Sequence, residues 1–292
     1  MNKTAAIAVT RFIVADRVPP HAYFLVSAVF HYLGPAFAVM LFASVAPLGV
    51  AWLRIASAAL VFAIWRRPWR YFYALSRTDR WTVVALGVVL AGMNSLFYLA
   101  IDRLPLGTVG AIEFLGPVAV AAAGTKTLRN IFALGIAVTG VAVLTDVRLA
   151  DEPIGYLFAF ANCALFTAYI VLGHRISGSG GIDRLGIAML IATIAALPVG
   201  IHQAAPAFLN PFLLAAGIGV GISSSVIPYV TDQLAMARLP RASFALLLSI
   251  LPATATVIGL LVLRQIPTPA ELAGIALVVV GVAVHHATDI GS

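Results

Sequence analysis

Two residues of opposite charge interrupt long apolar stretches of this chain. Arg54 lies about six residues from one end of the stretch 48–65, and Glu113 about seven residues from one end of 106–124. At about 1.5 Å per helical residue, both lie roughly 10 Å below the same predicted membrane boundary. Equal depth predicts an Arg54–Glu113 ion pair, which reduces the cost of burying either charge. One interpretation is that this pair only locks two helices together. The other places a substrate carboxylate at Arg54 and an ammonium or proton at Glu113.

Further polar residues fall at membrane depth, where each needs an explanation. His31 lies about ten residues into 21–44, where it could line a cavity and exchange a proton, or hydrogen-bond a neighbouring helix as a core residue. Asp232 lies near the end of 211–235 and is expected to reach or pair at the interface, with proton coupling as the alternative. The other candidate cavity residues, each of which also fits helix packing or an aromatic belt, are Asn94, Tyr98, Asn162, Ser224 and Tyr229.

The composition requires membrane-spanning helices to position these residues. Hydrophobic residues make up 62% of the 292 residues and charged residues only 10%, whereas soluble domains have about 45–50% and about 25%. The stretches are continuously apolar rather than alternating, which favours helices over strands. We therefore predict an all-α polytopic membrane protein with ten transmembrane helices. The predicted spans are 21–44, 48–65, 81–101, 106–124, 130–146, 154–173, 185–203, 211–235, 242–263 and 271–287.

The distribution of basic residues predicts the orientation. With residues 1–20 as a cytoplasmic arm, fourteen of the 18 lysines and arginines fall on the cytoplasmic side, while Arg103, Arg148 and Arg264 fall outside. This asymmetry places both termini in the cytoplasm. It also accounts for the net charge of +7 without a nucleic-acid partner. The cytoplasmic set is Lys3, Arg11, Arg17, Arg66, Arg67, Arg70, Arg77, Arg80, Lys126, Arg129, Arg175, Arg184, Arg238 and Arg241.

The two halves of the chain resemble each other. Residues 48–64 align without a gap with 185–201 at eight identical positions, and Arg-Leu-Pro at 103–105 recurs at 238–240. Chance similarity among apolar helices is the alternative, but matched order over most of each half favours a repeat. Five spans per repeat make the second copy inverted, which is a design of secondary transporters. The predicted repeats are 21–146 and 154–287.

Prolines interrupt the fourth and ninth spans at matched positions, Pro117 and Pro252. A proline inside a helix removes a backbone hydrogen bond and kinks the helix. We predict these residues as bending points for alternating access, with a static kink that shapes the cavity as the alternative.

Several segments identify a resemblance to a known family. The segments 47–70, 103–121 and 224–253, with Glu113-Phe114-Leu115-Gly116-Pro117 and Ile227-Pro228-Tyr229, resemble the EamA-type drug/metabolite transporter superfamily. Within it, the chain is similar to bacterial threonine/homoserine and related amino-acid exporters. Relatives often carry Glu before the proline of the ninth helix, where this chain has Leu251. The resemblance implies metabolite export, with amino acids as the expected substrates.

Other classes of function lack their sequence signatures. No Gly-Lys-Ser/Thr phosphate loop is present, and His285 and His286 are adjacent rather than one helical turn apart, so neither a nucleotide cofactor nor a metal is expected. We predict a bacterial inner-membrane secondary transporter that exports amino acids or similar small metabolites by alternating access. Energy would come from the substrate gradient or from proton exchange. The alternatives are an exporter of other metabolites or drugs, a channel, or an intramembrane enzyme.

Overall fold

The structure, a computed structural model, describes residues 19–116, 128–146, 152–178, 180–239, 247 and 250–286. The regular structure in these ranges is helical throughout. The helices are α2 (Pro20–Leu41), α3 (Pro47–Arg66), α4 (Trp69–Phe72), α5 (Arg77–Ile101), α6 (Leu106–Glu113), α8 (Leu128–Asp146), α9 (Pro153–Ile176), α10 (Gly181–Leu209), α11 (Pro211–Gly221), the π-helix η1 (Ile222–Val226), α12 (Ile227–Met236), α14 (Leu251–Leu263) and α15 (Pro269–His286).

Six of the described helical segments are long and apolar enough to cross a membrane. They are α2, α3, α5, α9, α10 and the continuous run α11–η1–α12, while α8, α14 and α15 contain shorter apolar helices. This confirms the prediction of an all-helical polytopic membrane protein. Helix α10 ends at Leu209, beyond the predicted limit of residue 203. The ten-span topology, the inverted repeat and the orientation of the termini stay predictions.

Prolines and one asparagine mark where several spans begin. Pro20, Pro47, Pro153 and Pro211 lie in the first turns of α2, α3, α9 and α11. A proline is tolerated there because the first backbone N–H groups of a helix have no partner within the helix. Asn210 caps α11 because its side-chain oxygen accepts from the backbone N–H of the next turn. These prolines and the asparagine therefore mark the starts of the helices.

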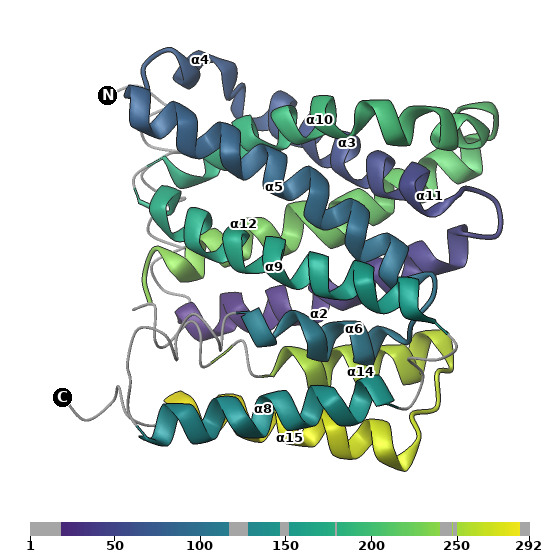
Figure 1. Cartoon of the computed structure of the whole chain (residues 1–292). Helices are drawn as coiled ribbons and strands as arrows, with labels where there is room; N and C mark the ends of the chain where they lie inside the picture. Colours follow the sequence, from purple (N-terminus) through teal and green to yellow (C-terminus); the bar gives the residue numbers. More distant parts are fainter. Residues whose placement is uncertain are drawn as a thin grey trace.

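The helices form two outer pairs around a central group, and their axes run roughly in the same direction (Figure 1). One outer pair is α3 with α10, and the other is α8 with α15. Glycines allow both pairs to pack closely. A Cβ atom on Gly49 of α3 would lie 2.5 Å from the backbone oxygen of Gln203 in α10, and one on Gly140 of α8 would lie 2.6 Å from that of Gly274 in α15. Small residues drive such packing in lipid.

The central group comprises α2, α5, α6, α9, α12 and α14. Helix α2 packs against α12 and α14, and α9 packs against α5 and α6. At the end predicted to face the cytoplasm, Arg66 forms two hydrogen bonds of 2.7 and 2.8 Å with the carboxylate of Asp183, joining α3 to α10. Arg184 and Asp79 form a second ion pair there at 3.7 Å. These contacts position the helices whose side chains form the site.

Candidate functional site

Arg54 is held by the π-helix η1. The side chain lies on α3 and is 3% exposed. Its Nε donates to Ser225 Oγ at 2.8 Å, and its Nη2 donates to the backbone oxygen of Ser224 at 2.6 Å. In an α-helical register this oxygen would accept from residue 228, but Pro228 has no N–H to donate. Single-turn π-helices occur often at functional sites, and here the turn presents a backbone acceptor to a buried cation.

Aromatic side chains complete the surroundings of Arg54. Its guanidinium carbon lies 5.4 Å from the ring centre of Tyr98 and 5.9 Å from that of Tyr229, within the range of cation–π attraction. Nη2 also donates weakly to Tyr229 Oη at 3.4 Å, and that hydroxyl donates to Asn94 Oδ1 at 3.3 Å. The third nitrogen, Nη1, takes no part in the hydrogen bonds that join Arg54 to η1 and to Tyr229. Nε and Nη2 therefore fix the position of Arg54, and Nη1 is not needed for these contacts.

Glu113 is buried among three helices. The carboxyl group, at the end of α6, is 2% exposed. It accepts a hydrogen bond from Tyr32 Oη of α2 at 3.1 Å and another from Asn162 Nδ2 of α9 at 2.6 Å. The side-chain oxygen of Asn162, Oδ1, is buried without a partner among the described residues. Glu113 is thus oriented by neutral donors.

The predicted Arg54–Glu113 ion pair is wrong. No contact within 4.0 Å joins the two side chains, because Arg54 is drawn to η1 and Glu113 to α2 and α9. Instead, both groups line one small cavity of about 10 Å³, which holds about one water molecule. The cavity is lined by His31, Arg54, Met93, Asn94, Phe97, Glu113, Asn162 and Tyr229.

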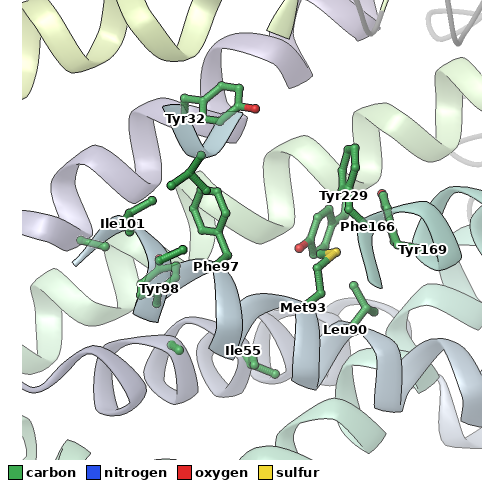
Figure 2. Packing of buried hydrophobic residues seen from close by; sticks show 14 of the residues in the cluster. Tyr32, Ile55, Leu90, Met93, Phe97, Tyr98, Ile101, Phe166, Tyr169 and Tyr229 are labelled. Carbon is green, nitrogen blue, oxygen red and sulfur yellow. The ribbon is translucent and has the colours of Figure 1, made fainter. Parts of the chain in front are cut away.

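The structure brings six of the eight candidate cavity residues together in this central cavity. The other two, Tyr98 and Ser224, contact Arg54 without lining the cavity. Sequence reasoning missed Met93 and Phe97, whose positions one helical turn apart on α5, beside Asn94, were the available signal. Figure 2 shows both among the buried residues of the core.

His31 lines the cavity through its ring. It is 7% exposed, and its ring centre lies 5.2 Å from that of Tyr32 and 5.9 Å from that of Phe166. Neither ring nitrogen forms a hydrogen bond within the described ranges. His31 therefore faces the cavity, and it lacks the hydrogen bond to a neighbouring helix that a core histidine would make within the described residues.

Asp232 does not reach the interface, contrary to expectation. It is 5% exposed and accepts hydrogen bonds from Ser27 Oγ of α2 and, at 3.1 Å, from Tyr169 Oη of α9. Tyr169 in turn contacts Tyr229, with ring centres 5.4 Å apart, and Figure 2 shows these two rings together with Phe166. Asp232 is therefore connected to the cavity wall without lining the cavity.

The two candidate hinges differ in what the structure shows. Pro252 is in the first turn of α14, where proline is tolerated. Pro117 lies outside the described residues. The hinge role of both stays a prediction.

A buried site with groups of both charge signs, inside an apolar helical bundle, is compatible with a membrane transporter of small molecules. Residues 153–285 match the EamA-like transporter family. Over 250 residues, covering 84% of both chains, the sequence is 34% identical to the threonine/homoserine exporter RhtA of Escherichia coli strain K12 and 32% identical to that of Salmonella typhimurium strain LT2. A solved crystal structure shares the fold, with a TM-score of 0.58 and 20% identity over 93% of this chain and 99% of its own. The chain belongs to the EamA-like transporter family and is a membrane exporter of small metabolites.

Proposed function

We propose that this protein exports amino acids or similar small metabolites across the bacterial inner membrane, and that the substrate binds in the central cavity. One observation carries the proposal. A cation, Arg54, and a carboxyl group, Glu113, face the same buried cavity without pairing with each other. Two opposite charges held apart are complementary to a zwitterion.

The hydrogen-bonding capacity left in the cavity matches the two ends of an amino acid. Nη1 of Arg54 would donate to the substrate carboxylate. The ammonium group would donate to Glu113 and to Asn162 Oδ1, the buried acceptor that lacks a partner. Met93 and Phe97 supply apolar surface for the substrate side chain. A buried polar group left unpaired is costly, so a ligand that pairs it gains affinity.

We propose alternating access as the mechanism, with ten transmembrane helices in two inverted repeats and both termini in the cytoplasm. The packing supports this topology, because exchanging the first and second repeats converts the α2–α12 contact into the α9–α5 contact and the α2–α14 contact into the α9–α6 contact. The cavity also draws on both repeats, with Glu113 from the first and Asn162 from the second. At about 10 Å³ it is closed around its site, so a substrate requires the repeats to move apart.

A carboxyl group that is oriented by neutral donors can also exchange a proton when the cavity opens to water. Glu113 and His31 line the cavity, and Asp232 is linked to its wall through Tyr169 and Tyr229. We propose these three residues as the candidates for coupling export to a proton gradient. The alternative is export driven by the substrate gradient alone.

The test is counterflow in proteoliposomes with a labelled substrate panel. Vesicles loaded with unlabelled L-threonine, L-homoserine or an aromatic amino acid are expected to accumulate the labelled compound transiently and saturably. If none of these amino acids exchanges while another metabolite or a drug does, the amino-acid proposal fails and the rival substrate class replaces it. Flux that shows no saturation and no counterflow would instead indicate a channel.

A further inference from the structure

A second, larger cavity lies at the end of the bundle predicted to face outward. Its volume is about 350 Å³, within the range of about 300–1,000 Å³ common for ligand pockets. Its lining includes residues 101–105 and 265–267. Its polar and charged lining residues are Asp102, Arg103, Thr108, Thr256, Gln265 and Glu271.

The outer cavity and the central cavity are aligned along the same three helices. Each of α2, α5 and α6 contributes residues to both, separated by eight, four and five positions. At about 1.5 Å per residue, the two cavities are roughly 6–12 Å apart along the helix axes. On these helices the outer cavity is lined by Val39, Ile101 and Thr108, and the central cavity by His31, Phe97 and Glu113.

Close packing separates the two cavities. Gly110 lies on α6 between Thr108 and Glu113. A Cβ atom on Gly110 would lie 2.8 Å from the Cβ atom of Ala255 in α14 and 3.1 Å from Tyr32 Oη in α2. Three helices therefore meet at this point with no space for a ligand. Their separation would join the cavities into one passage.

The outer cavity retains unused binding capacity. Thr108 is 3% exposed, and its hydroxyl makes no hydrogen bond with the described part of the chain. Asp102 and Arg103 place opposite charges side by side at the rim. Within the described residues, Arg103 forms a loose ion pair at 3.6 Å with Glu152, and both side chains are about two-fifths exposed. Ile101 adds apolar surface. The charged lining residues are two carboxylates, Asp102 and Glu271, and one guanidinium, Arg103, so a small molecule with both charges matches the lining better than an anion does.

We propose that the outer cavity is a second binding site for the same zwitterionic substrate, occupied after the central site during export. The inference rests on the proposed function, because the central site supplies the ligand. The Tyr32–Gly110–Ala255 contact is the closure between the two sites. The outer site holds the substrate while this closure re-forms behind it.

The experiment uses cysteine reactivity in right-side-out membrane vesicles. Cys163, the chain's single cysteine, is buried on α9 and is first replaced by alanine. In that background, Thr108→Cys is labelled from outside with a membrane-impermeant charged thiosulfonate, with and without external L-threonine. Threonine at about nine times its dissociation constant should slow labelling about tenfold, as expected for simple occupancy. Ser44→Cys, an exposed position in the α2–α3 loop, should be labelled at the same rate with or without threonine.

Threonine counterflow, measured in parallel, separates this proposal from the proposed function. Protection of Thr108→Cys together with counterflow supports both. Counterflow without protection overturns the outer site and leaves the proposed function standing. Protection without counterflow supports the site and contradicts amino-acid transport, and the absence of both overturns both. If Thr108→Cys fails to fold, Val39→Cys is a second reporter in the same cavity. Counterflow without threonine protection of Val39→Cys would equally overturn the outer site.

Discussion

Replacing Glu113 with glutamine tests the charge at the centre of the site. The side chain keeps its shape, and its remaining oxygen can accept from Asn162 Nδ2 while its new NH₂ group donates to Tyr32 Oη. The variant should therefore fold, with a loss of about 1–3 kcal/mol because the Tyr32 hydroxyl proton loses its acceptor. What it loses is a charged partner for the substrate ammonium. A hydrogen bond to a charged group contributes about 1.5–3 kcal/mol, and each 1.4 kcal/mol is about tenfold in affinity.

The expected result is a rise of about 10- to 100-fold in the half-saturation constant for threonine counterflow. The matched control is Asp232→Asn, since Asp232 is equally buried and also accepts from a tyrosine, but lies outside the cavity. Its half-saturation constant should stay unchanged, and any coupling role would appear only in how the rate depends on a proton gradient. An unchanged constant in Glu113→Gln, or an equal rise in both variants, would refute the reasoning.

Three further predictions concern Arg54, the α3–α10 packing and the ion pair at the end of that pair. Arg54→Lys should raise the half-saturation constant for counterflow at least about tenfold, because a compact ammonium lacks the planar fork that lets the guanidinium bond to η1 through two nitrogens and face the cavity with the third; an unchanged constant would remove Arg54 from the binding site. Gly49→Ala should destabilise the protein by about 1–3 kcal/mol in detergent melts, because its Cβ would contact α10 backbone. The control is Gly135→Ala, which has open space around it and should not lower the melting temperature. Equal melting temperatures for the two variants would contradict the close packing of α3 on α10. Asp183→Asn should lower the free energy of unfolding by only about 1 kcal/mol, because its partner Arg66 is 37% exposed and water screens the ion pair. A much larger loss of stability would contradict a small contribution from this ion pair.

Apolar length was enough to predict the helices. A stretch without charges has to span the bilayer or be buried, and the depth of a polar residue follows from its distance to the end of that stretch. The sequence placed His31, Asn94, Glu113 and Asn162 at membrane depth without relating one to another, and the structure places all four in one cavity. Their roles in transport stay predictions.

The neighbouring helix that each side chain faces could not be predicted in the same way. Arg54 and Glu113 have equal depth, but pairing also depends on how each helix is rotated, which tertiary packing sets. The π-helix turns Ser224 and Ser225 toward Arg54, and no local pattern in the sequence announces such a turn. Asp232 was misplaced for a related reason, because its partners lie on helices distant in sequence.

The most direct test of the central claim is competition by threonine analogues that lack one charge. In counterflow with labelled L-threonine, 3-hydroxybutyrate lacks the ammonium group that Glu113 would bind, and 1-amino-2-propanol lacks the carboxylate that Arg54 would bind. We predict that unlabelled threonine competes fully and that each analogue inhibits at least about tenfold more weakly. Inhibition by either analogue as strong as that by threonine would contradict a site that holds both ends of a zwitterion.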